Sequence, residues 1–132
     1  MPCAIQLAGA SQFASLSGKL TLAGNITGAF TLTVDGLGNM EISGALATGA
    51  GGLNKNGAGA LVLSGTNTFT GAATVNAGLL RAASGGALSA SSGVTVNYGG
   101  ALAIGPGGAA GATAVVSRLT LNPGAACNIE FA

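Results

Sequence analysis

Short segments in which apolar and polar residues alternate recur along the whole chain. Apolar side chains at positions i and i+2, with polar residues between them, indicate β-strands that have one buried face. Clusters of glycine, asparagine and serine separate the segments, as turns require. The pattern predicts strands at residues 19–22, 30–34, 40–42, 61–63, 94–96, 102–104, 119–121 and 129–131.

The charged residues follow the same alternation. Five of them lie beside an apolar residue at the outward position of a predicted strand, namely Lys19, Glu41, Arg81, Arg118 and Glu130. A chain without regular structure would not keep its charges in phase with its apolar residues. We therefore expect Leu61 to point into a core and Thr95 to point outward.

The apolar pairs also repeat at a fixed distance of about 20 residues, or twice that, which is the sequence signature of a solenoid. One series contains Leu20/Leu22, Met40/Ile42, Leu61/Leu63, Leu80/Ala82, Leu102/Ile104 and Leu119/Leu121. A second series lies between these pairs and contains Phe30/Leu32, Val75 and Val94/Val96. Such coils bury their inner faces only by stacking on one another. We therefore expect residues 1–132 to form one all-β domain, a parallel β-helix of about six coils.

Two other fold classes fit the composition less well. The 25 glycines argue against a helical bundle, because glycine destabilises a helix interior. The apolar content of 48% and the net charge of +1 argue against disorder. An antiparallel sandwich remains the alternative, but it does not predict the repeat, and it usually carries more aromatic residues than the 4% found here.

The scarcity of charge limits the possible partners. The four basic residues, Lys19, Lys55, Arg81 and Arg118, are scattered along the chain and form no patch that would attract nucleic acid or an anionic membrane surface. No apolar run approaches the roughly 18 residues of a membrane-spanning helix.

Residues 52–80 closely resemble the autotransporter-associated β-strand repeat. The shared positions include Gly52, Leu53, Lys55, Gly57, Gly59, Leu61, Leu63, Ser64, Gly65, Asn67, Thr68, Thr70, Gly71, Val75, Gly78 and Leu80. Phe69 replaces the usual tyrosine of the repeat, and Ala73 stands where threonine is common. Residues 84–104 look like the usual continuation, whereas residues 1–51 are similar only in style.

The resemblance implies a right-handed parallel β-helix stalk, outside the cell or on its surface. In such proteins the stalk is exported through a C-terminal membrane barrel, for which this chain has no room. We therefore expect a fragment or a short relative, attached to a membrane only through a missing barrel domain. The resemblance also implies architectural roles for the repeat residues, so Lys55 and Asn67 are expected in turns and corners.

The sequence predicts no catalytic, cofactor-binding or metal-binding residues. The only acids are Asp35, Glu41 and Glu130, and paired-carboxylate catalysis needs two acids close together. The chain has no histidine for a catalytic triad or a zinc site.

Three further motifs have plain interpretations. Gly105–Gly108 reads as a turn, because no Lys-Ser/Thr follows it as in a phosphate loop. Asn25-Ile26-Thr27 fits a glycosylation acceptor, a triplet that is common by chance. Threonine rows at Thr31/Thr33 and at Thr66/Thr68/Thr70 do not recur in every coil, so we expect them to reflect β-propensity on a solvated face.

Two functions remain open. The chain is either a non-catalytic stalk segment, whose partners are the flanking coils of a longer passenger, or a subunit that stacks end to end with itself into a filament. No small-molecule substrate or nucleic acid is expected as a partner. Six stacked coils also place Cys3 and Cys127 about 24 Å apart, so these residues should not form a disulfide within one chain.

Overall fold

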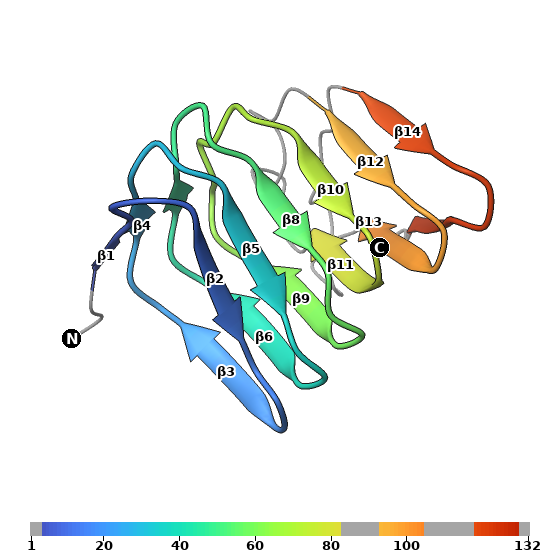
Figure 1. Cartoon of the computed structure of the whole chain (residues 1–132), viewed down its shortest axis with the longest axis horizontal. Helices are drawn as coiled ribbons and strands as arrows, with labels where there is room; N and C mark the ends of the chain where they lie inside the picture. Colours follow the sequence, from blue (N-terminus) through green and yellow to red (C-terminus); the bar gives the residue numbers. More distant parts are fainter. Residues whose placement is uncertain (1–3, 83–92, 105–117, 130–132) are drawn as a thin grey trace.

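The computed structural model describes residues 4–82, 93–104 and 118–129, and within these residues every regular element is a β-strand (Figure 1). The described residues contain no helix long and apolar enough to cross a membrane. The strands are β1 (Ile5–Gln6), β2 (Ser11–Ala14), β3 (Lys19–Leu22), β4 (Ile26–Thr27), β5 (Leu32–Asp35), β6 (Asn39–Ile42), β7 (Leu46–Ala47), β8 (Leu53–Lys55), β9 (Ala60–Leu63), β10 (Ala73–Val75), β11 (Gly78–Ala82), β12 (Val94–Val96), β13 (Gly100–Ile104), β14 (Leu119–Leu121) and β15 (Ala126–Ile129).

The strands form three parallel sheets that wind into a solenoid. Sheet A has the order β1-β4-β7, sheet B the order β14-β12-β10-β8-β5-β2, and sheet C the order β15-β13-β11-β9-β6-β3. Successive strands of a sheet come from successive coils, so six strands in sheets B and C correspond to about five full turns. The predicted parallel β-solenoid is thus confirmed, close to the expected six coils, and the antiparallel sandwich is wrong.

The coils are stacked in register, so equivalent residues form columns along the solenoid axis. In sheet C, Leu20 pairs with Met40, Met40 with Leu61, Leu61 with Leu80, and Leu80 with Leu102. The four members after Leu20 are at most 1% exposed. The predicted ladder is therefore the inner wall of the solenoid as far as Leu102.

The last coil departs from that ladder. The sequence predicted that Leu119 and Leu121 continue the leucine series of sheet C. This prediction is wrong, because they pair with Val94 and Val96 in sheet B. Cys127 pairs with Leu102 and continues sheet C. The stretch of chain from Val94 to Leu119 is longer than the equivalent stretch in each earlier coil of sheet B, yet it returns to the same column. Backbone hydrogen bonds between neighbouring strands determine which residues share a column. The extra residues before Leu119 therefore lengthen the repeat distance in the sequence but do not change the stacking of the strands.

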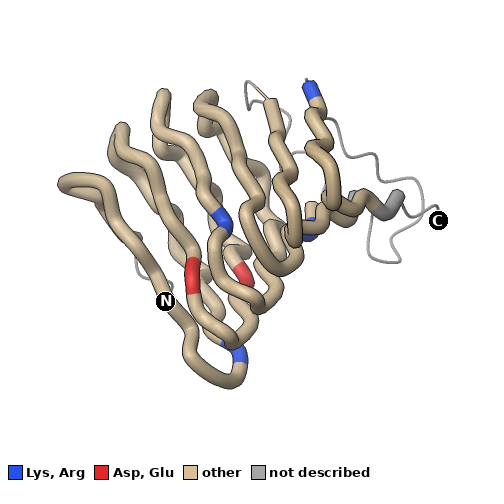
Figure 2. Tube along the Cα trace, turned by 45° about the vertical axis from the view of Figure 1, so that its right-hand side comes forward, with Lys and Arg blue, Asp and Glu red and all other residues tan. Residues whose placement is uncertain are grey.

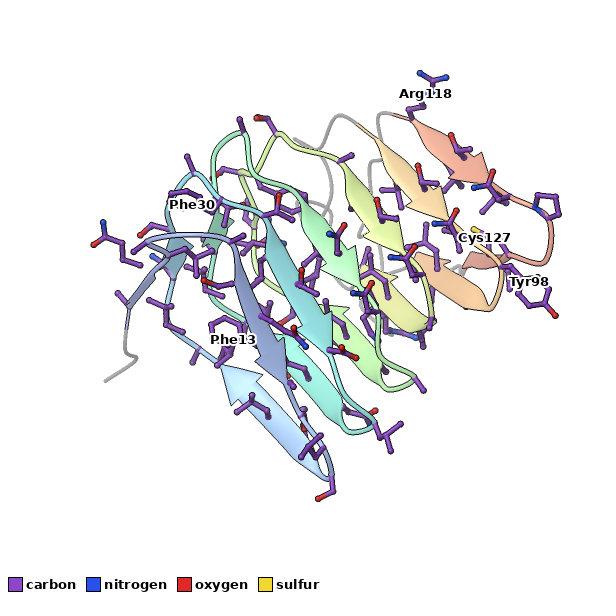
Figure 3. All side chains as sticks on the ribbon, viewed as in Figure 1. Phe13, Phe30, Tyr98, Arg118 and Cys127 are labelled. Carbon is purple, nitrogen blue, oxygen red and sulfur yellow. The ribbon has the colours of Figure 1, made fainter. Side chains whose placement is uncertain are left out.

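The second predicted series also needs a correction. Phe30, labelled in Figure 3, lies before β5 and is exposed by 40% of its surface, whereas Leu32 and Val34 point inward. The inward column of sheet B therefore runs from Leu32 through residues 53, 73, 94 and 119. The predicted strand at 129–131 corresponds to the end of β15, and Glu130 and Phe131 lie outside the described residues.

Glycine is required where two coils approach closely at a corner. Gly36 has a φ of +98°, and a Cβ added to it would overlap the backbone carbonyl of Ser15 in the preceding coil. A Cβ on Gly59 would likewise overlap the carbonyl of Gly38. The corners therefore stack backbone directly on backbone, and this close contact accounts for much of the chain's glycine content.

Prediction one compares an inward with an outward position. Leu61 is fully buried in the central column of sheet C, whereas Thr95 lies half-buried on the outside of sheet B. Leu61→Asp should unfold the protein, because a carboxylate without a partner would enter an apolar interior. Thr95→Asp should change the free energy of unfolding by less than about 1 kcal/mol, as typical surface substitutions do.

Chemical denaturation followed by circular dichroism measures both variants. Since Leu61→Asp is expected to be unfolded, Leu61→Ala provides a measurable intermediate, with an expected loss of about 2–5 kcal/mol. Equal effects at positions 61 and 95 would contradict the assignment of the inward face.

Candidate functional site

One charged side chain lies inside the solenoid. Lys55 ends β8, is 1% exposed, and occupies the inward column of sheet B between Val34 and Val75. Its Nζ donates to the carbonyl oxygen of Gly57 at the next corner, and it lies 3.5 Å from the carbonyl oxygen of Ala77. The resemblance predicted Lys55 in a turn or corner. The structure instead places it at the end of a strand, and its side chain bonds to corner carbonyls from inside the solenoid.

Burial lowers the pKa of Lys55 below its ordinary value of 10.5, and the negative charge of Asp35 opposes part of this shift. An ammonium in an apolar interior loses its hydration, which disfavours the charged form. The corner carbonyls supply acceptors in place of water. This arrangement fixes the chain path between β8 and β9 and offers no open access to the amine.

Several asparagines hold neighbouring coils together. Asn67 is 3% exposed, and its Oδ1 accepts a hydrogen bond of 2.8 Å from the backbone N–H of Leu46 in the preceding coil. Asn25, the possible glycosylation acceptor, accepts from the N–H of Ala45 at 2.9 Å. In both cases a side-chain oxygen from a neighbouring coil accepts the hydrogen bond of a backbone N–H. This keeps the N–H groups of Leu46 and Ala45 hydrogen-bonded.

A second group of asparagines forms an outward ladder that directly follows the strands of sheet B. In this asparagine ladder, Asn76 donates to Asn56, Asn97 to Asn76, and Asn122 to Asn97, over distances of 2.7, 2.7 and 2.5 Å. Sequence reasoning missed it, although an asparagine directly follows β8, β10, β12 and β14 in the sequence. Asp35 holds the same position one coil earlier, where it accepts hydrogen bonds from Gln12 and from the N–H of Gly36.

A threonine column runs beside the asparagine ladder on the outside of sheet B. It consists of Thr33, Thr74, Thr95 and Thr120, interrupted by Asn54, and it begins at Gln12. The sequence did not reveal this column, because its members stand in different coils and each has only apolar neighbours in its strand. By contrast, Thr66, Thr68 and Thr70 lie outside the strands.

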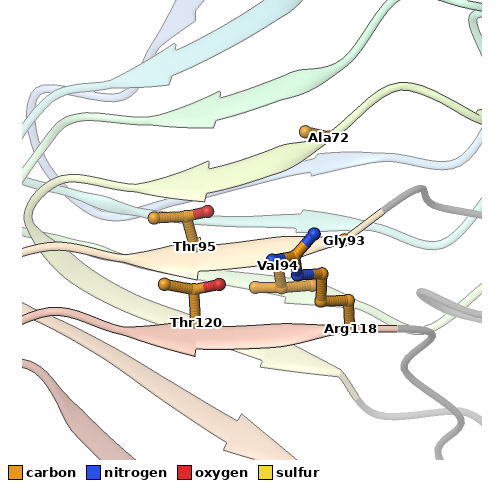
Figure 4. Close-up of a pocket in the computed structure, with 6 residues that line it drawn as sticks. All are labelled: Ala72, Gly93, Val94, Thr95, Arg118 and Thr120. Carbon is orange, nitrogen blue, oxygen red and sulfur yellow. The ribbon is translucent and has the colours of Figure 1, made fainter.

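The outer face of sheet B is hollowed near its C-terminal end, as Figure 4 shows. The Arg118 hollow has a volume of about 200 Å³ and is lined by Ala72, Gly93, Val94, Thr95, Arg118 and Thr120. Ala72 and Gly93 contribute little or no side chain, so the backbone forms the floor. Arg118 precedes β14 and accepts a hydrogen bond of 2.7 Å from the N–H of Val94 through its carbonyl oxygen.

The remaining charges are dispersed over the solenoid, and Figure 2 shows no basic cluster in its described part. Lys19 and Glu41 form an ion pair of 3.2 Å between adjacent strands of sheet C. The described residues contain no group of three or more acidic or cysteine side chains that would hold a metal ion. Glu41 and Asp35 both have partners, and Glu130 lies outside the described residues, as do Gly105–Gly108.

Only one of the two cysteines lies in the described part of the chain. Cys127 is a free, half-buried thiol in the last coil of sheet C, whereas Cys3 lies outside the described residues. The expectation that these two do not bridge within one chain therefore stays a prediction.

Prediction two concerns the buried lysine. Because the pKa of Lys55 is lowered on folding, the unfolded chain binds more protons between the folded pKa and 10.5. The free energy of unfolding should therefore rise with pH across this window. Lys55→Met, which keeps an unbranched apolar chain, should remove the rise. The measurement is urea denaturation at several pH values from 7 to about 10.5. Parallel pH profiles of the two proteins would contradict the prediction.

Comparison with known proteins identifies one segment of the chain. Residues 53–82, from β8 to the end of β11, match the family model of the passenger-associated-transport-repeat. No curated protein and no solved structure matches the chain. The matched segment spans two successive strands of sheet B and two of sheet C in the middle of the solenoid, and Lys55, Leu61, Asn67 and Phe69 are among its buried side chains. The chain thus carries a passenger-associated-transport-repeat within a parallel β-solenoid, and the matched repeat and the fold together fit an autotransporter passenger repeat.

Proposed function

We propose that this solenoid is a non-catalytic stalk segment of an exported passenger, displayed outside the cell. The observation that carries the proposal is the matched repeat at residues 53–82, stacked in register with the coils on both sides. Continuous sheets B and C make a rigid rod whose length grows with each added coil. Such a rod holds whatever is attached to it at a distance from its anchor.

The use of polar side chains supports a structural role. Lys55 and Asn67 are the buried polar residues of the repeat, and both bond to backbone groups of the solenoid itself. The asparagine ladder bonds within itself. These groups are therefore occupied in holding the coils together and are not free for chemistry on a substrate.

Prediction three tests the location of the protein. Antibodies against the folded chain should label intact cells that produce it naturally, because a displayed stalk exposes its outer faces. Brief protease treatment of the intact cells should remove the signal, while a cytoplasmic marker protein stays intact. Labelling that appears only after lysis would contradict surface display.

A second candidate, end-to-end self-association, is favoured by the exposure of inward columns at the two ends. Leu20 in the first coil is 36% exposed, and Leu119 and Leu121 in the last coil are 38% and 48% exposed, whereas Leu61 in the middle is fully buried. Phe13 and Cys127 mark the two end faces in Figure 3. We infer that further coils cover these faces, either from a longer passenger or from a second copy.

A second copy fits because the two end faces are compatible. Stacking the first coil on the last would place Phe13 over Leu121 and Leu20 over Cys127, if the register of the internal coils continued. Such a head-to-tail contact does not close on itself and therefore grows into a filament.

Prediction four is that sedimentation velocity shows species larger than the monomer as the concentration rises to high micromolar. Leu121→Glu should suppress them by placing a charge in the contact. Leu37→Glu is the matched control, since Leu37 is 75% exposed but lies at a corner away from the end faces. A monomer at all concentrations, or equal effects of the two substitutions, would assign the faces to other coils of the passenger.

A further inference from the structure

Arg118 differs from the other basic residues because the fold does not use its charge. Lys19 pairs with Glu41, Lys55 bonds to corner carbonyls, and Arg81 also has an interaction partner. Arg118 is exposed, and Figure 3 labels it directly before β14. In the part of the chain that the structure describes, its guanidinium has no hydrogen bond or ion pair. A guanidinium that the fold leaves unused is available to an external anion.

The surroundings of Arg118 add a shaped surface. The column that leads to it across sheet B contains Gly52, Ala72 and Gly93, and these described residues place no bulky side chain over the backbone. The Cβ that Gly93 lacks would lie 3.4 Å from the Arg118 Cβ. This is an ordinary van der Waals distance, so the Arg118 side chain lies close to Gly93, as Figure 4 shows.

Two hydroxyl groups complete the hollow. Thr95 and Thr120 are paired neighbours in the threonine column and line the hollow together with Arg118. None of the described residues that line it is acidic. Asp35, the acid on the same sheet, belongs to β5, which is four strands away from β14. A ligand that enters the hollow thus meets the positively charged guanidinium of Arg118 and two neutral hydroxyl groups that donate and accept hydrogen bonds.

We propose that the Arg118 hollow binds a carboxylate-bearing sugar, such as a uronate residue of an acidic polysaccharide. The guanidinium matches a carboxylate with two parallel hydrogen bonds. The threonine hydroxyls match the ring hydroxyls, and the flat floor accepts the sugar ring. A volume of about 200 Å³ is smaller than a typical drug-sized pocket and suits a single sugar residue. This proposal does not depend on the stalk function.

The site is open to water, so one sugar should bind weakly, with a dissociation constant on the order of millimolar. A polymer offers many such residues, and several copies of the chain on one surface would offer several hollows. Multivalent contact then raises the overall affinity without any new interaction. Each chain would hold one sugar residue of the polymer near the C-terminal end of sheet B.

The test is an NMR titration of the isotope-labelled full chain with oligoglucuronate, compared with a neutral oligoglucose of the same length. Backbone amide signals of Gly93, Val94 and Thr120 should shift with oligoglucuronate only. Arg118→Gln should weaken the binding about tenfold, as expected for a lost charged hydrogen-bond pair. Thr95→Val combined with Thr120→Val should weaken it as well, with the charge intact.

Lys19→Gln is the control that removes an exposed positive charge elsewhere, and it should leave the affinity unchanged. Free glucuronate separates recognition of the single sugar from avidity for the polymer, and it should shift the same signals at higher concentration. The proposal is overturned if oligoglucose binds equally well, or if sodium acetate at equal ionic strength reproduces the full response. It is also overturned if Arg118→Gln and Lys19→Gln weaken binding to the same extent. None of these outcomes bears on surface display, so the two proposals fail separately.

Discussion

Backbone hydrogen bonding between coils is the constraint on which the rest of the structure depends. A coil of a parallel solenoid has no partner within itself, so its N–H and C=O groups must pair with the coils on either side. This pairing forces equivalent residues into columns. The columns then decide which side chains form the interior, which corners come into contact, and which polar groups face each other along the axis.

The same constraint explains the unusual residues of the chain. Where the backbone leaves a group without a partner, a side chain from a neighbouring coil or corner supplies one, as Asn67 does for Leu46 and Lys55 for Gly57. Where two corners meet, only glycine fits, as at Gly36 and Gly59. The repeat motif is therefore a set of solutions to one stacking problem, which fits a structural role better than a chemical one.

Uniform stacking also leaves its exceptions visible. The longer path into the last coil, from Val94 to its partner Leu119, places Arg118 beside Gly93 and next to two threonines of the outer column. The column that contains Arg118 carries small residues at Gly52, Ala72 and Gly93. The other basic side chains of the described residues have interaction partners within the protein. In the described residues, the outer face of sheet B thus combines the threonine column and the asparagine ladder with a single cation, and the proposed sugar site lies where the threonine column reaches Arg118.

From the sequence alone we predicted the repeat period, most strands of sheet C and their inward phase, because each coil repeats a local pattern that burial requires. The short strands of sheet A were not predicted. The sequence also predicted the ladder from Leu20 to Leu102 and the repeat at residues 52–80, which the family model matches at residues 53–82. Only the tertiary structure decided that Lys55 points inward, that Leu119 belongs to sheet B, and that the threonines and Arg118 line a common hollow. These facts depend on which residue of one coil pairs with which residue of the next, and backbone hydrogen bonds between residues far apart in the sequence set that register. A change in coil length is visible in the sequence, but the column to which the chain returns is a property of the stack.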